Sequence, residues 1–361
     1  MPELRKDPIL DDWLIVAESR ALRPNQFARP AQDQSGPPCS PSQPQLAGEE
    51  ATDGAAKGPC APEPGCPFCR GHERQTPQEL LVVRRLAPAD SSDWQVRVVP
   101  NKYPALVPEP LPIDSGSQDN GLCRSIPGAG AHEVVIESPL HVERTSELSD
   151  AQLAQVLQAV RDRFRSWKQR EGWKYGIWFK NAGEAAGASM EHLHSQLIGL
   201  PLVPARIGQQ LAASRAFYER HNRCIYCRLV SEEIETGDRL VHRTDQLVAF
   251  CPFASRFAYE TWIVPRYHAS HFEDSESEEL NLLAVVLRRI LKRIETVVAS
   301  SAYNVILHTA PFDTDGLPHY HWHIEVLPQT SRPAGFEWGT GMAVNPVPPA
   351  KAALLLKVDP F

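Results

Sequence analysis

Residues 181–196, NAGEAAGASMEHLHSQ, combine a small-residue loop with two histidines and a glutamine. We expect a strand over residues 190–200. Side chains two residues apart on a strand share a face, so His192, His194 and Gln196 would point into one cleft. A histidine in such a cleft can attack phosphorus while amide and backbone N–H groups bind the charged oxygens. A half-buried strand whose polar face meets water would show the same residues, so the pattern alone leaves both interpretations open.

A related pattern occurs twice along the chain, which favours the functional interpretation. Each copy has a Cys-x-x-Cys pair, a histidine at the end of an expected strand and a histidine on a later strand. The members are Cys66, Cys69, His141 and His192 in the first copy, and Cys224, Cys227, His268 and His321 in the second. The interval between the two histidines is nearly the same in both copies. We therefore interpret the chain as two diverged repeats.

Both sets of residues predict a zinc site. Zinc favours tetrahedral Cys and His ligands, and a Cys-x-x-Cys pair brings two thiolates to one ion with little strain. Each ion would tie one segment of the chain to the strand that carries the later histidine, which is a structural role. An alternative for the second set is a pair of core cysteines near unrelated histidines. His319 and His323 share the expected face of His321, and either could replace it or add to the site.

The two copies differ at the position where the chemistry is expected. The first has an Asn, Gly and Ser loop before its histidine pair and Gln196 after it, whereas the second has TAPFDTDGLP before and Glu325 after. A carboxylate would repel a phosphate, whereas an amide would donate a hydrogen bond to it. We therefore place the reaction on His194, with His192 bound to the metal.

Composition and charge limit the class of partner. The chain has 361 residues and a net charge of −7, with no basic stripe. We therefore expect a small molecule as the partner, and neither nucleic acid nor a membrane surface. No apolar run approaches the roughly 20 residues of a membrane span, and the first residues lack the apolar core of a secretory signal. We therefore expect a cytoplasmic protein, in which eight cysteines are not a disulfide framework.

Strands and two long helices are expected to position these residues. Helices are predicted over residues 146–172, 206–222, 275–300 and 350–358, the first with an N-terminal cap at Ser149. Strands are predicted over residues 11–20, 79–86, 94–106, 132–141, 174–181, 245–253, 260–268, 303–312 and 319–328. Residues 30–64, which contain Cys39 and Cys60, and residues 107–130 are rich in Pro, Gly and Ser and are expected to be loops. The Gly-rich tail from Gly335 could close over a ligand.

These motifs resemble those of the galactose-1-phosphate uridylyltransferases, members of the histidine-triad superfamily. The family pattern is an Asn and Gly-rich loop, a Ser and His-Pro-His-x-Gln, and here Leu193 replaces the usual Pro. The similarity extends to RKDPILDDWLIVAESRALRP, CPFC, PNKYPAL, IESPLH, HTAPF and HWHIEVLP. The CIYC site is more like the branch that contains the plant ADP-glucose phosphorylase than the branch with an all-His/Glu iron site.

The resemblance implies a role for each matching residue. His194 would be the nucleophile, Gln196 would hold the phosphoryl oxygens and Ser189 would contact the departing phosphate. Arg23 and Arg20 would meet phosphates. Contacts to the nucleotide would come from Asn181 and Gly187, and contacts to the base from Asn101 and Tyr103. Lys102 stands where many members have an acidic residue.

The implied fold is α+β, with two histidine-triad-like halves, residues 1–203 and 204–361, forming one bilobed unit. Each half would have a mainly antiparallel sheet with a packed helix. The implied reaction is transfer of a nucleoside monophosphate from UDP-glucose to galactose 1-phosphate, a step of galactose and carbohydrate metabolism, in a homodimer with two zinc sites. Alternatives are an ADP-glucose phosphorylase, a histidine-triad nucleotide hydrolase, and a zinc-stabilised nucleotide-binding module without a reaction.

Overall fold

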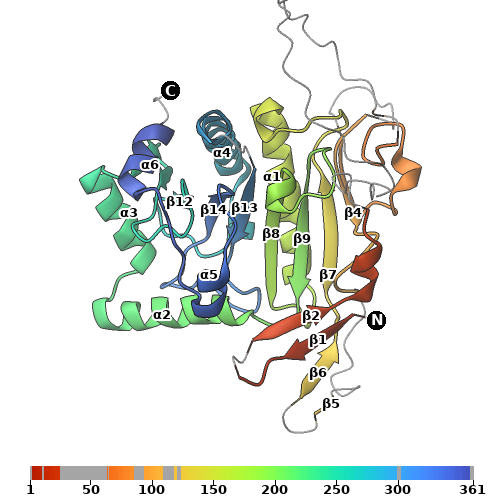
Figure 1. The fold of residues 1–361 in the computed structure, drawn as a ribbon, viewed down its shortest axis with the longest axis horizontal. Coiled ribbons are helices and arrows are strands. Elements are labelled where there is room, and N and C mark those ends of the chain that lie inside the picture. The colour runs from red at the N-terminus through yellow and green to blue at the C-terminus, as the bar shows by residue number, and fades with distance from the viewer. Residues whose placement is uncertain are drawn as a thin grey trace, which may run out of the picture.

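The computed structural model describes residues 2–9, 12–24, 63, 65–84, 93–108, 118–119, 123–298 and 302–357. Cys39 and Cys60, with nearly all of the loop expected over residues 30–64, lie outside the described residues. Figure 1 shows helices and strands arranged around one large sheet. No helix in these ranges is both long enough and apolar enough to cross a membrane.

The large sheet has ten strands in the order β10-β11-β12-β14-β13-β8-β9-β7-β4-β3, and all neighbouring strands are antiparallel. One half of it consists of β3 Leu81–Arg84, β4 Trp94–Pro100, β7 Ala131–Ile136, β8 Tyr175–Ala182 and β9 His194–Leu200. The other half consists of β10 Leu240–Arg243, β11 Leu247–Phe250, β12 Thr261–Pro265, β13 Tyr303–His308 and β14 His323–Pro328.

The order of the strands repeats about the middle of the sheet. Along the chain, the first half runs β7, a helix, β8 and β9, and the second runs β12, a helix, β13 and β14. Read toward the middle of the sheet, these strands have the equivalent orders β7-β9-β8 and β12-β14-β13. The halves join where β8 pairs with β13, with Asn181 opposite Asn304. The predicted α+β class and the predicted repeat are therefore confirmed. The strands of the two halves form one continuous antiparallel sheet.

Two long helices pack against each other and on the sheet. The helix α1 Asp150–Lys168 begins after Ser149, whose side chain accepts a hydrogen bond from the Gln152 N–H, so the predicted cap is confirmed. The helix α4 Ser277–Val297 begins at a capping box formed by Glu276 and Glu279. Both bury their apolar faces in one continuous core with the sheet. This core contains residues from the strands of both halves.

A smaller sheet lies at the N-terminal end of the chain. Its order is β2-β1-β6-β5, with β1 Glu3–Lys6, β2 Trp13–Val16, β5 Gln118–Asp119 and β6 Arg124–Pro127. Residues 107–130 were expected to be a loop, and this was wrong for β6, which pairs with β1 along its whole length. The 3-10 helix η1 Glu18–Leu22 follows β2 and carries Arg20, while Arg23 caps its end.

The described residues also contain four further α-helices and four further 3-10 helices. The predicted helices near residues 206 and 350 are confirmed as α2 Ala205–His221 and α6 Pro349–Leu356. The helix α3 Ile225–Thr236 was not expected; it ends at Gly237, whose φ of 70° suits glycine. The Gly-rich tail from Gly335 begins with the short helix α5 Gly335–Thr340. The remaining 3-10 helices are η2 Glu73–Gln75, η3 Thr145–Glu147, η4 Glu184–Ala186 and η5 Phe272–Asp274.

Candidate active site and metal centres

His194 is the first residue of β9 and is buried, with 8% of its surface exposed. The strand was expected to begin near residue 190, but His192 lies in the turn before it. The Nδ1 atom of His194 lies 2.8 Å from the carbonyl oxygen of His192. A carbonyl only accepts, so Nδ1 carries the proton and Nε2 keeps its lone pair. Burial lowers the pKa of His194, so the imidazole is neutral at pH 7 and can act as a nucleophile.

A loop of small residues brings the chain close to this imidazole. The loop leaves β8 after Ala182, forms η4 and turns at Gly187, whose φ of 84° favours glycine. A cavity of about 180 Å³ borders His194, and its walls include Asn181, Gly183 and Tyr303. The amide of Asn181 accepts a hydrogen bond from Asn304 at 2.8 Å. Asn181 and His194 therefore line the same cavity, and the Asn181 amide lies close to Gly187.

The remaining phosphate-binding candidates come from three segments. The guanidinium of Arg23 donates to the hydroxyl of Ser189 at 2.5 Å. The guanidinium of Arg20 instead donates to the carbonyl oxygen of Tyr103 at 3.2 Å, which holds η1 against the loop after β4. Burial lowers the pKa of both arginines, although both stay charged at pH 7. The structure thus gives Arg23 a direct contact with the catalytic loop and gives Arg20 an anchoring contact.

Gln196 lies two residues along β9 from the nucleophile, on the same face of the strand. Its Oε1 atom is 2.8 Å from Nε2 of His132 on β7, a residue that was assigned no role from the sequence. Asn101 approaches the same imidazole and accepts a hydrogen bond from the Tyr103 N–H at 2.9 Å. Lys102 is exposed. Asn101, His132 and Gln196 therefore form a connected polar group behind the nucleophile.

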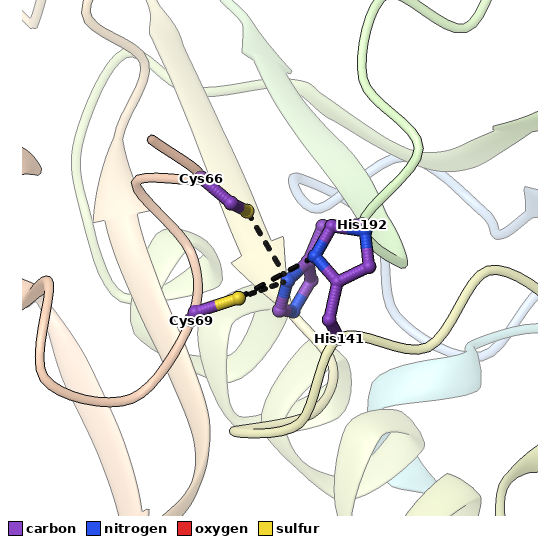
Figure 2. Close-up of side chains that lie close together, drawn as sticks. All are labelled: Cys66, Cys69, His141 and His192. Atoms are coloured by element: carbon purple, nitrogen blue, oxygen red, sulfur yellow. Dashed lines mark hydrogen bonds between the residues drawn. The ribbon is translucent and has the colours of Figure 1, made fainter. Parts of the chain in front are cut away.

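The first predicted metal set forms a compact cluster (Figure 2). All four ligand atoms of Cys66, Cys69, His141 and His192 lie within 4.8 Å of one another. The Cys66 sulfur is 3.4 Å from Nδ1 of His192, and the Cys69 sulfur is 3.4 Å from Nδ1 of His141. The ring of Phe68, between the two cysteines, packs against His194 with centroids 5.4 Å apart. The cysteine loop therefore contacts His194 directly, a link that the sequence pattern did not reveal.

The second predicted set also forms a cluster, nearer to solvent. The ligand atoms of Cys224, Cys227, His268 and His321 lie within 4.8 Å of one another, and His268 is exposed. Cys227 is 3.5 Å from Nδ1 of His268, and Cys224 is 3.7 Å from Nδ1 of His321. His319 does not belong to this group.

The surroundings of both clusters fit a metal ion. The far ring nitrogen of His192 donates to the Ser138 carbonyl at 3.0 Å, and that of His321 donates to the Tyr267 carbonyl at 2.7 Å. Each Nδ1 lone pair is thereby directed at the thiols, as in metal-bound histidines. Burial raises the pKa of Cys69 to about 11, so its thiolate needs a cation beside it. Two clusters of this composition can bind metal.

The second half has a histidine, His323, at the position equivalent to His194, but a carboxylate at the position equivalent to Gln196. His323 places Nδ1 3.2 Å from the His321 carbonyl, as His194 does with His192. Glu325 occupies the position of Gln196 and forms an ion pair with Arg256 at 2.6 Å. Burial acts to raise the pKa of Glu325, but the nearby His308 and Arg256 outweigh it and hold the pKa well below its usual value. A charged carboxylate at this position does not favour a phosphate ligand.

Comparison with known proteins identifies the family. The profile described as "Galactose-1-phosphate uridyl transferase, N-terminal domain" matches residues 1–204. The chain belongs to the galactose-1-phosphate uridyl transferase family. A second profile, "Domain of unknown function (DUF4921)", matches residues 129–356. Family membership agrees with the resemblance found in the sequence motifs.

Similarity to individual members of the family covers nearly the whole chain. ADP-glucose phosphorylase from Arabidopsis thaliana is 33% identical over 359 residues, 99% of this chain and 92% of the relative. Galactose-1-phosphate uridylyltransferase from Thermotoga maritima is 27% identical over 365 residues, 99% of this chain and 98% of the relative. A crystal structure of the Arabidopsis thaliana ADP-glucose phosphorylase with bound ADP-glucose covers 100% of both chains, with a TM-score of 0.72 and 30% identity.

Proposed function

We propose that the protein transfers a nucleoside monophosphate from a nucleotide sugar to a phosphate-bearing acceptor through a covalent intermediate on His194. The observation that carries this proposal is the hydrogen bond from His194 Nδ1 to the His192 carbonyl. It fixes the orientation of the ring and leaves Nε2 as the nucleophilic atom. The amide of Gln196 and the Arg23–Ser189 pair supply donors for the phosphate oxygens.

The reaction is a double displacement at the α-phosphorus. His194 Nε2 forms a bond to phosphorus, and the bond to the sugar-phosphate oxygen breaks, the electron pair leaving with the sugar phosphate. The positive charge that develops on the imidazole is stabilised by the hydrogen bond from Nδ1 to the His192 carbonyl. An oxygen of the acceptor phosphate then attacks phosphorus, the P–N bond breaks, and His194 returns to its neutral form. Ser189 contacts the departing phosphate, and placement and charge stabilisation are the main contributions of the site.

Two donor and acceptor pairs fit this chemistry. The sequence motifs predict UDP-glucose with galactose 1-phosphate. The second pair is ADP-glucose with inorganic phosphate, which is favoured by the 33% identity to the Arabidopsis thaliana ADP-glucose phosphorylase and by the Cys and His composition of the second cluster. In both cases Asn181 and Gly187 would lie along the nucleotide, and Asn101 and Tyr103 near the base.

We further propose that the metal in both clusters is zinc. A set of two thiolates and two imidazoles is the usual composition of a structural zinc site. Zinc would be held by Cys66, Cys69, His141 and His192 in the first site, and by Cys224, Cys227, His268 and His321 in the second. The ion supplies a cross-link between chain segments. Following the family resemblance, we also propose a homodimer, which sedimentation analysis would test.

The test is to incubate the protein with UDP-glucose or ADP-glucose labelled at the α-phosphate. Acid-labile label on His194 from the uridine substrate, released by galactose 1-phosphate, supports the uridylyltransferase. Label from the adenine substrate alone, released by phosphate, supports the phosphorylase. Label that only water removes would indicate a hydrolase, and the complete absence of label from both substrates would refute the proposed covalent intermediate.

A further inference from the structure

His132 has both ring nitrogens engaged in the interior of the protein. It lies on β7, 5% exposed, next to β9 in the large sheet. Its Nδ1 atom lies 2.9 Å from the backbone N–H of Ala105, which can only donate. Nδ1 is therefore the unprotonated nitrogen, and Nε2 carries the proton.

This tautomer decides which end of the Gln196 amide faces His132. A protonated Nε2 at 2.8 Å can only donate, so the Gln196 atom beside it must be the carbonyl oxygen Oε1. The assignment follows from the Ala105 N–H, which by itself decides which end of the Gln196 amide is the oxygen and which is the nitrogen. With Oε1 held in this way, the NH₂ group of Gln196 is the end that remains for a ligand.

The contact of His132 with Asn101 does not support the other tautomer. Nδ2 of Asn101 lies 3.1 Å from Nε2 of His132, a distance at which it could donate to an unprotonated Nε2. That arrangement would place a proton on Nδ1, facing the Ala105 N–H at 2.9 Å. Two donors, one of them fixed in the backbone, would then oppose each other in the interior, which is unfavourable. With the proton on Nε2, the Asn101 amide makes no hydrogen bond to the ring, but its side chain can rotate away from Nε2, whereas the Ala105 N–H cannot move from Nδ1.

We propose that His132 is a positioning residue that holds the Gln196 amide with its NH₂ group directed at the phosphoryl group on His194. The inference rests on the proposed function, because it assigns Gln196 a phosphoryl ligand. Without His132, the amide could rotate and present its oxygen to the phosphate, which would be repulsive. Burial lowers the pKa of His132 to about 4, with Arg20 and Arg23 acting in the same direction, so the imidazole stays neutral at pH 7.

A purely structural role for His132 is the competing explanation. The bond from the Ala105 N–H anchors the loop after β4, and loss of that anchor alone could disturb the site. Two substitutions separate the roles, because each places a polar atom at the position of only one of the two ring nitrogens. In His132→Asn the short amide reaches only the Nδ1 position and can still accept from Ala105. In His132→Gln the longer amide reaches the Nε2 position and can donate to Gln196.

The experiment is a single-turnover measurement of label transfer from the nucleotide sugar to His194, with nucleotide affinity measured in parallel. We expect His132→Asn to lower the rate by about 10²-fold, the scale of one lost oxyanion donor, with nucleotide affinity changed less than about threefold. His132→Gln should recover the rate to within about fivefold of wild type. His221→Asn, an exposed histidine on α2, is the matched control and should leave the rate unchanged.

A double-mutant cycle tests whether His132 acts through Gln196. In a Gln196→Ala background, His132→Asn should lower the rate by less than about threefold further. Additive losses, or equal losses for His132→Asn and His132→Gln, would overturn the positioning role. The ¹⁵N spectrum of histidine-labelled protein tests the geometry separately: a proton on Nε2 of His132 is expected, and a proton on Nδ1 would refute the proposal. Absence of label in the wild type, with the Nε2 tautomer present, would instead refute the proposed function.

Discussion

His194 and His323 share a backbone setting but differ in their neighbours. Each places Nδ1 against the carbonyl of the histidine two residues earlier. His194 borders a cavity, whereas the ring of His323 is stacked between those of His308 and Trp262, with centroids 4.8 and 4.9 Å away. The same residue type therefore has access to a ligand in one half and is enclosed in the other.

The first prediction concerns this pair of histidines. His194→Ala should abolish covalent labelling by the nucleotide sugar while nucleotide affinity stays within about tenfold, because only the nucleophile is removed. His323→Ala is the matched control and should leave the label on His194. Mass spectrometry of the labelled peptides checks the position. Label on any residue other than His194 in the wild type would contradict the assignment.

A second prediction concerns the pH dependence of stability and rests on His132. Its pKa is about 4 in the folded chain and about 6.5 when exposed, so the unfolded chain binds more protons in between. The stabilisation that comes from the neutral imidazole is present above about pH 6.5 and is lost as pH falls toward 4. Between pH 7 and pH 5 the unfolding free energy should fall by about 2 kcal/mol more in wild type than in His132→Gln.

Denaturant unfolding of both proteins at the two pH values checks this difference. Loss of metal at low pH affects wild type and variant alike, so the comparison isolates His132. Equal slopes would show that His132 is already charged or is exposed in the folded chain.

At the scale of elements, the loop that carries the first Cys-x-x-Cys connects a candidate metal cluster to His194. Phe68 packs against His192 and His194, with ring centroids 5.9 and 5.4 Å away. A metal that fixes Cys66 and Cys69 would therefore also fix the ring that supports the nucleophile. In the second cluster the equivalent ring is that of Tyr226 in CIYC, and it packs on His321 and His323, with centroids 6.1 and 5.3 Å away.

The third prediction follows from this difference. Cys66→Ser should remove one zinc per chain and lower the labelling rate by about 10 to 100-fold, whereas Cys224→Ser should remove the other zinc with a smaller loss of rate. A chelator should extract the second zinc first, because His268 is exposed and Cys227 is partly exposed. Metal content by mass spectrometry, measured beside the labelling rate, checks both points. Equal losses of rate in the two variants would contradict the role of Phe68.

The sequence predicted the elements whose signals are local. The long helices have apolar residues at regular spacing and polar caps, so α1 and α4 were found with ends that differ by two to four residues. The strand β6 and the helix α3 were missed, because β6 depends on pairing with the distant strand β1. The metal ligands were predicted from their repeated spacing. His132, Phe68 and Asn304 carry no motif, and only the pairing of strands brings them to the site.

At the scale of the whole molecule, the seam between β8 and β13 connects the two halves of the sheet. The amide of Asn304 on β13 donates to Asn181 at 2.8 Å and to the carbonyl of Ala186 at 2.9 Å. The oxygen of Asn304 in turn accepts from Gln329. The second half thus supports the loop that precedes the nucleophile. We propose that the halves divide between residues 203 and 204, in the turn between β9 and α2.

The fourth prediction concerns this seam. Asn304→Ala removes both donors and should lower the labelling rate about tenfold and the unfolding free energy by about 1 to 3 kcal/mol, because two acceptors in partly buried hydrogen bonds lose a partner. Asn304→Asp is a sharper comparison: it has nearly the same size but cannot donate, so it should lose at least as much. Thermal unfolding and single-turnover labelling check both variants. A wild-type rate in Asn304→Asp would show that the loop needs no support from the second half.

The position of Asn304 also has a consequence for how the site responds to dilution. Asn304 and Asn181 belong to one polypeptide, so their encounter is intramolecular and has an effective concentration that does not change with the number of molecules in solution. Two separate subunits would dissociate as their concentration fell. Fusion of the halves keeps this side of the catalytic loop assembled even where the cell makes only a few copies.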